Sequence, residues 1–240
     1  MATVAPQRVG YARDHVFFFS IAVAMAVTVV VGFGSHALAG RVDIPGVPFW
    51  VHLHGLVFMS WMGFYVFQNW LILKGNVGRH RRLGWVGAGL AAIIVALGVF
   101  TGLAAVQMQR QPPFFAPDYF LSLTFLSMLG FGGLTAAAVA MRRRTEWHRR
   151  LMLCGTIVLI NPAWGRLLPM PLLGGVGGQW AIFGMLMIYA AWAVIHDWRA
   201  RGRIHPAYYW GIGAIVLWQV AMGPLATTPP IQALANALTA

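Results

Sequence analysis

Long apolar segments dominate this chain and constrain its fold more than any other feature. A helix needs about 20 apolar residues to cross the hydrocarbon layer of a bilayer, and the sequence contains seven such segments. Charged residues make up only 9% of the chain, whereas soluble domains contain about a quarter. The sequence therefore predicts an all-α integral membrane bundle, a single transmembrane domain over residues 1–240, with helices at about 16–38, 49–73, 83–107, 119–141, 151–171, 179–196 and 207–224.

Lysine and arginine are divided unequally between the two sides of this predicted bundle. With the amino terminus in the cytoplasm, 14 of the 17 Lys and Arg residues fall on the cytoplasmic side, and only Arg41, Arg110 and Arg166 fall outside. Because such residues collect in cytoplasmic loops, we expect a cytoplasmic amino terminus and a periplasmic carboxyl terminus in a bacterial inner membrane. The formal charge of +12 then predicts contacts with anionic lipids at the cytoplasmic face, with no role for nucleic acid.

The tetrapeptide His-Arg-Arg-Leu occurs twice, beginning at His80 and at His148. The predicted topology puts both copies at the cytoplasmic face, at the starts of the third and fifth helices. One interpretation is that their arginines anchor these helices among lipid headgroups. The other is that the two imidazoles, at matching heights and beside arginines, bind a b-type haem, which needs axial histidines and cations for its propionates.

Topology also sorts the eight histidines by side, with His15, His80, His148, His196 and His205 inside and His36, His52 and His54 outside. The second helix adds a polar and aromatic stripe, because steps of four, three, four and three residues put one face together, formed by His54, Phe58, Trp61, Tyr65 and Gln68. This stripe predicts either helix packing or a cofactor slot. The candidate cofactor-binding residues are therefore His54, His80, His148 and Gln68, and the three histidines are the candidate haem-iron ligands.

A metal-dependent hydrolase is an alternative, because catalytic zinc needs about three nitrogen or carboxylate ligands. The cytoplasmic side offers them in Asp14, His15, His80, Glu146, His148, His196 and Asp197. The chain contains a single cysteine, Cys154, which excludes a disulfide within the chain and any cysteine-based metal motif. We expect this thiol to be buried and structural.

The fifth predicted helix contains a proline and an arginine. Asn161-Pro162 interrupts the helical pattern, and Arg166 follows at outer-leaflet depth. An arginine inside a membrane usually pairs or faces a cavity, and Asp118, at the outer start of the fourth helix, is the expected partner of Arg166. Asp118, Asn161 and Arg166, together with His54, therefore predict an outward-facing polar pocket. If Pro162 instead ends the helix, Arg166 lies at the surface and no such pocket forms.

Residues 50–107 also resemble a known pattern. His54, Trp61, Gln68 and the segment HRRLG (80–84) are similar to the H…W…Q…HRxLG pattern of an uncharacterised family of bacterial multi-pass membrane proteins, which implies no particular activity. More loosely, they resemble the helical cores of cytochrome b561-type proteins, whose helix histidines ligate haem b. That resemblance implies His54 and His80 as ligands, with His148 as their partner.

The sequence leaves three functions open. The first is electron transfer linked to haem b or to a quinone. The second is a non-enzymatic accessory or scaffold subunit of a larger membrane complex, in which the histidines contact lipids and helix ends. The third is the metal-dependent membrane hydrolase.

Overall fold

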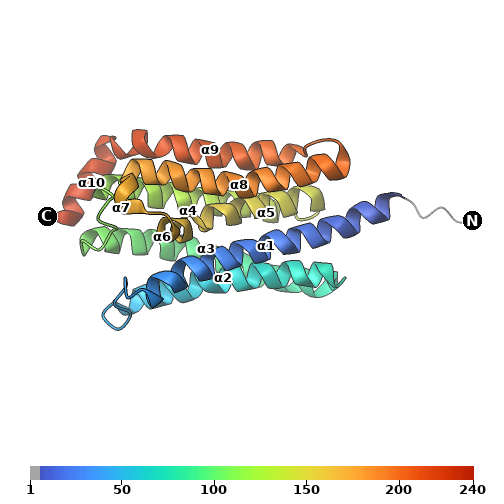
Figure 1. Cartoon of the computed structure of the whole chain (residues 1–240), viewed down its shortest axis with the longest axis horizontal. Helices are drawn as coiled ribbons and strands as arrows, with labels where there is room; N and C mark the ends of the chain where they lie inside the picture. Colours follow the sequence, from blue (N-terminus) through green and yellow to red (C-terminus); the bar gives the residue numbers. More distant parts are fainter. Residues whose placement is uncertain (1–5) are drawn as a thin grey trace, which may run out of the picture.

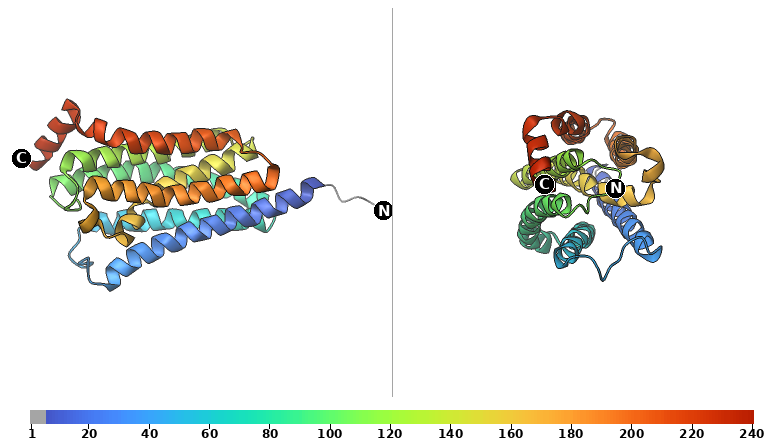
Figure 2. Two further views of the ribbon diagram at one scale, coloured as in Figure 1. Left: turned by 45° about the horizontal axis from the view of Figure 1, so that its top comes forward. Right: turned by 90° about the vertical axis from the view of Figure 1, so that its left-hand side faces the viewer.

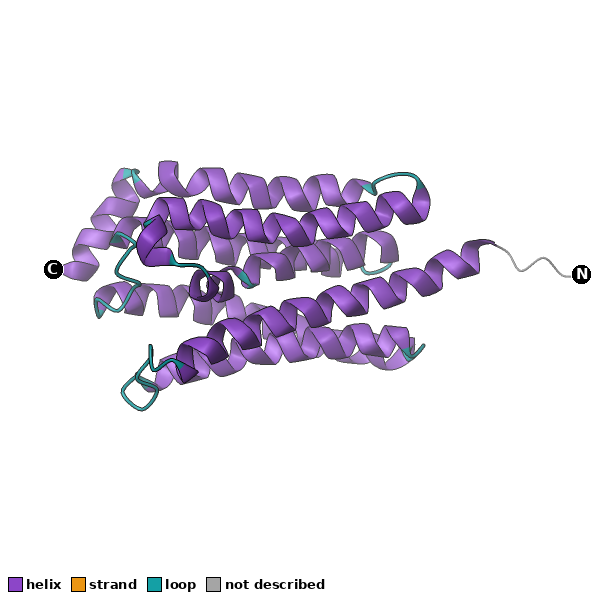
Figure 3. Ribbon diagram, in the orientation of Figure 1, coloured by secondary structure: helices purple, strands orange, loops and turns teal. Residues whose placement is uncertain are grey.

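The computed structural model describes residues 6–240, with side chains from Arg13 onward, and the regular elements in that range are all α-helices (Figure 3). The all-α prediction is therefore confirmed. The helices are α1 (Pro6–Leu38), α2 (Phe49–Leu73), α3 (Val77–Gln107), α4 (Pro117–Ala140), α5 (Thr145–Leu159), α6 (Asn161–Leu167), α7 (Met170–Leu173), α8 (Gly175–Arg201), α9 (Pro206–Ala226) and α10 (Pro229–Thr239).

Six of the described helices are long and apolar enough to cross a membrane, namely α1 from Arg13 onward, α2, α3, α4, α8 and α9. They run roughly parallel to one another (Figure 1). Along the chain α1, α2, α3 and α4 pack in sequence, α9 packs on α4, and α8 lies between α9 and α1. The six helices thus form a ring, which is seen from one end in Figure 2.

Helix α5 lies inside this ring and packs against α4, α8 and α9. Nine of the ten residues from Leu151 to Ile160 are buried, including the free thiol of Cys154. A segment that is apolar on every side is typical either of a helix buried in protein or of a membrane span, and the burial of residues 151–160 puts this part of α5 in the first class. Its 15 residues span only about 22 Å, which is too short for a complete crossing.

The predicted helix over 151–171 is divided in the structure. α5 ends at Leu159, Ile160 forms a turn, and α6 begins at Asn161. The cause is Pro162, which has no N–H to donate to the preceding turn and whose ring hinders a continuing α-helix. α6 then turns away from the line of α5, is seen nearly end-on in Figure 1, and packs against α1 and α8.

Two other boundaries differ from the predicted ones. α3 and α5 begin about six residues earlier than expected, at Val77 and Thr145, so both His-Arg-Arg-Leu segments are helical rather than preceding the helices. The carboxyl-terminal helix α10 was not predicted. It begins at Pro229 and covers part of α3 and α4.

The turns between the helices divide into two sets at opposite ends of the bundle. The start of α1 and the α2–α3, α4–α5 and α8–α9 turns lie at one end, which we call the basic end because it contains 14 of the 17 Lys and Arg residues (Figure 1). The α1–α2 and α3–α4 loops and the carboxyl terminus lie at the other end. The described start and the end of the chain are therefore at opposite ends of the bundle.

Candidate functional site

A cavity of about 590 Å³ opens at the basic end of the bundle, between α1, α2, α3, α4 and α5. Its volume falls within the range of about 300–1,000 Å³ that is usual for small-molecule sites. Aromatic side chains supply much of its wall, among them Phe18, Phe64 and Tyr65. Both histidines of the repeated tetrapeptide also line it.

His80 of α3 and His148 of α5 lie side by side in this cavity, with ring centroids 6.2 Å apart and ring planes 73° apart. The Nδ1 atom of His148 is 2.8 Å from the carbonyl oxygen of Ala138. Because a carbonyl can only accept, Nδ1 of His148 holds the hydrogen and Nε2 has a free lone pair.

The second imidazole also has a nitrogen without a hydrogen bond. The buried Nδ1 of His80 has no protein partner, so it is available to a ligand. Each ring thus keeps one nitrogen able to contact a ligand, and in His148 the other nitrogen is oriented by the backbone, as is usual for metal-binding histidines.

Three further side chains form what we call the polar floor of the cavity, namely Trp61, Gln68 and Thr135. They are only 3%, 7% and 3% exposed. Nevertheless, the indole N–H of Trp61, both amide atoms of Gln68 and the hydroxyl of Thr135 have no hydrogen-bond partner in the protein. Buried polar groups without partners are rare and costly, so these atoms indicate a place for polar atoms of a ligand or for ordered water.

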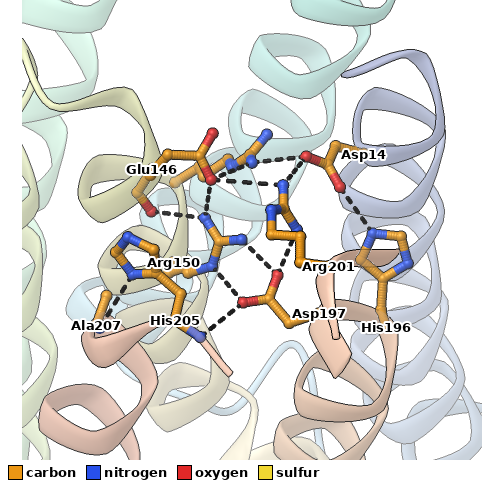
Figure 4. A network of polar contacts seen from close by, with 9 residues as sticks. Asp14, Glu146, Arg150, His196, Asp197, Arg201, His205 and Ala207 are labelled. Carbon is orange, nitrogen blue, oxygen red and sulfur yellow. Dashed lines mark hydrogen bonds and ion pairs between the residues drawn. The ribbon is translucent and has the colours of Figure 1, made fainter. Parts of the chain in front are cut away.

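A cluster of charged side chains lies at the basic end, and most of its members are labelled in Figure 4. It brings together three of the chain's five acidic residues and three arginines, from α1, α5 and α8: Asp14, Glu146, Arg149, Arg150, Asp197 and Arg201. Opposite charges are equal in number, so the cluster is formally neutral. We refer to these six residues as the ion cluster.

The Arg150–Asp197 pair is the buried part of the ion cluster, since both side chains are 0% exposed. Nε of Arg150 donates to Oδ2 of Asp197 at 3.0 Å, and a second guanidinium nitrogen binds Oδ1. The same guanidinium reaches Glu146 at 2.6 Å. This two-pronged contact is the geometry in which arginine binds a carboxylate most strongly.

Asp14 joins α1 to the rest of the cluster. Its carboxylate binds Arg149 at 2.6 Å and also binds Arg201, and it lies 2.9 Å from Nε2 of His196. Arg149 also lines the cavity, so the ion cluster and the cavity share a wall. The next residue of α1, His15, lines the cavity as well.

The structure brings together many of the residues considered for a metal hydrolase, but it joins their carboxylates to arginines. Asp14, Glu146 and Asp197 each contact at least two guanidinium groups. Among the residues from 6 to 240 that the structure describes, no three His, Cys, Asp or Glu side chains are placed to hold one metal ion.

The other predicted site residues lie elsewhere. His54 is fourteen residues from Gln68, or about 21 Å along α2, so it does not join the pair of histidines in the cavity; its ring packs on Phe58 with centroids 4.2 Å apart. His54 does not line the cavity. The expectation that it acts together with His80 and His148 is therefore corrected.

In the predicted outward-facing pocket, Asp118 lies apart from Asn161 and Arg166. Asn161 is buried on α6, and Arg166 lies over the ring of Phe33 at 3.9 Å and donates to the carbonyl of Pro162 at 2.9 Å. Asp118 instead accepts from the backbone of Tyr119 and lines a shallow pocket beside α10. Within the described residues Asp118 and Arg166 do not form an ion pair, so the expected pairing is wrong.

Two features of the site were not foreseen. The hydroxyl of Thr135 on α4 belongs to the cavity, although nothing in its local sequence marks it. The ion pairs within single helices could have been predicted from spacing. Glu146 precedes Arg149 and Arg150, and Asp197 precedes Arg201, at the three- and four-residue steps that pair on a helix.

Comparison with protein-family models, with curated proteins and with solved structures finds no match to this chain. The site is therefore interpreted from its own chemistry.

The buried pair gives a test of the ion cluster. Asp197→Asn keeps the shape of the side chain but leaves the 0% exposed Arg150 without its main counter-charge, and breaking such a pair costs about 3–5 kcal/mol. We expect a clearly lower Tm of the detergent-purified protein. The control is Asp43→Asn, which removes an exposed carboxylate at the other end and should not change Tm. Equal Tm values for the two variants would contradict the assigned role.

His205, in the turn between α8 and α9, gives a pH test. Burial, and next the positive charge of Arg150, lower its pKa, and its Nδ1 accepts from the backbone N–H of Ala207 at 3.1 Å. Because the folded pKa lies below the unfolded value of about 6.5, this contribution to stability is complete above that pH and is lost as pH falls through the folded pKa.

We therefore expect Tm to fall between about pH 7.5 and 5, and to fall less in His205→Asn, which keeps an acceptor at this helix start. His52→Asn, at an exposed position, should keep the wild-type pH dependence. A His205→Asn protein with the full wild-type fall in Tm would refute this assignment.

Proposed function

We propose that this protein binds a b-type haem between His80 and His148 and transfers electrons in a bacterial inner membrane. The observation that supports this function best is the placement of two imidazoles, one from α3 and one from α5, with ring centroids 6.2 Å apart in one cavity with aromatic walls. A bound haem supplies one-electron redox chemistry. Its electrons would be exchanged with a quinone or with subunits of a membrane complex.

The residues of the cavity fit such a group. His80 and His148, whose ring centroids are 6.2 Å apart, would be the residues that hold its iron. The unpartnered Nδ1 of His80 also needs an occupant of the cavity to complete its bonding. The aromatic wall suits a flat, apolar macrocycle.

A quinone is a second candidate for the same cavity, and the polar floor supports it. A quinone carbonyl only accepts hydrogen bonds, and the floor offers unpartnered donors in the indole of Trp61 and the amide of Gln68. Both candidates imply redox function within the membrane, but they differ in the ligand that would be isolated with the protein.

The spectrum of the purified protein tests the haem. We expect protein expressed with excess haem precursor to show a Soret band, and reduced-minus-oxidised spectra with the bands of a six-coordinate b-type haem. His80→Ala and His148→Ala should each lose most of this absorbance, because one axial ligand is removed. His52→Ala, at an exposed position, is the matched control and should retain it.

A wild-type protein without a Soret band would reject the haem. If His80→Gln and His148→Gln then also leave any bound quinone and the assembly of the protein unchanged, a non-enzymatic accessory or scaffold subunit becomes the better interpretation.

For the membrane we propose seven crossings, with the amino terminus in the cytoplasm. The six long helices supply six, and the segment α5–α7, which leads from the α4–α5 turn to the start of α8 at the opposite end (Figure 1), supplies the seventh. The concentration of arginine at the basic end supports a cytoplasmic position for that end.

Reporter fusions test this topology. Alkaline phosphatase, which is active only in the periplasm, should be active when it is fused after Ala240 and inactive when it is fused in the α8–α9 turn at Gly202. A cytosolic fluorescent protein should give the reverse result. A carboxyl terminus found in the cytosol would overturn the proposed orientation.

A further inference from the structure

Two groups of arginines at the basic end have different surroundings. Arg149, Arg150 and Arg201 bind carboxylates in the ion cluster. A second group lines the cavity, is exposed, and forms no ion pair with any described carboxylate: Arg81, Arg142 and Arg143. We call these three residues the cavity mouth.

The cavity mouth is built from two separate turns of the chain. Arg81 belongs to the first turns of α3, whereas Arg142 and Arg143 lie in the α4–α5 turn. The guanidinium of Arg142 lies over the ring of Trp85 at 5.3 Å, which holds it in place by a cation–π contact. Three cationic groups, one from α3 and two from the α4–α5 turn, therefore line the cavity.

The interior behind the cavity mouth has a different character. It is walled by aromatic rings and ends at the polar floor, where the buried amide of Gln68 and the hydroxyl of Thr135 lack protein partners. A ligand that matches the aromatic wall, the polar floor and the cavity mouth needs a largely apolar body, polar atoms or a metal within the cavity, and negative charge at the end that faces the arginines.

We infer that the ligand of this cavity is amphipathic and anionic, and that Arg81, Arg142 and Arg143 bind its carboxylate or phosphate groups. This inference rests in part on the proposed function, because the two propionates of a haem are one source of such carboxylates. It deepens that proposal by favouring haem over a neutral quinone. The other source of the same chemistry is the phosphate of an anionic lipid whose chains enter the cavity.

Two triple variants form the test. R81Q/R142Q/R143Q removes the three charges of the cavity mouth. R79Q/R82Q/R144Q is the matched control, since it removes the same charge from the same two turns at exposed positions that do not line the cavity. The detergent-purified protein, freed of haem, is titrated with haem and with haem dimethyl ester, in which both carboxylates are blocked.

We expect the cavity-mouth variant to bind haem about tenfold more weakly than wild type, since three exposed charge contacts are lost. Its affinity for the dimethyl ester should equal that of wild type, and the control variant should bind both probes normally. Equal weakening in the two triple variants, or an equal loss for haem and for its ester, would overturn the inference.

A second measurement separates this inference from the proposed function. If the wild-type protein binds neither haem nor its ester, the haem proposal fails, and native mass spectrometry with phosphatidylglycerol and phosphatidylcholine then tests the cavity mouth alone. Retention of phosphatidylglycerol by wild type and by R79Q/R82Q/R144Q, but not by R81Q/R142Q/R143Q, supports an anionic lipid as the ligand. Equal retention by all three proteins, or no preference over phosphatidylcholine, overturns the inference.

Discussion

The fully buried ion pair between Arg150 and Asp197 is the interaction on which the architecture of the basic end depends. Charges removed from water are tolerated only with a partner in good geometry, and here the partners come from α5 and α8, 47 residues apart in sequence. The pair, with Glu146 and Arg201, fixes where α5 enters the ring of helices. Because His148 is on the same first turns of α5, the pair also sets the position of one imidazole of the cavity.

The cavity combines three chemical zones that no single helix could provide. α3 and α5 contribute the histidines, α2 and α4 the polar floor, and α3 with the α4–α5 turn the arginines of the cavity mouth. His148 is oriented by the backbone carbonyl of Ala138, not by another side chain. The polar side chains of the floor therefore remain available to a ligand.

Much of the fold could be predicted from the sequence. A helix needs a long apolar segment to cross lipid, and arginine collects in the loops on one side of such a bundle. The stripe of Trp61, Tyr65 and Gln68 was correctly placed on one face of α2, and Pro162 correctly marked the break after α5. Both predictions rest on local spacing or on proline stereochemistry, which a sequence displays directly.

The errors concern depth and partners across the bundle. His54 fits the same stripe as Gln68, but helical rise separates it from the histidine pair by most of the length of α2. Asp118 and Arg166 have opposite charges, yet each is held at its own helix start or break. Thr135 has no distinctive neighbours, so only the packing of α4 on α5 reveals it.

The enclosed position of α5 has a consequence for how the protein is made. This segment is short and begins with charged residues, so lipid alone is a poor environment for it, and its main counter-ion, Asp197, is synthesised later. The contacts of α5 with α8 and α9 therefore form only after those later helices have been synthesised, so α5 acquires its full set of partners late in the synthesis of the chain.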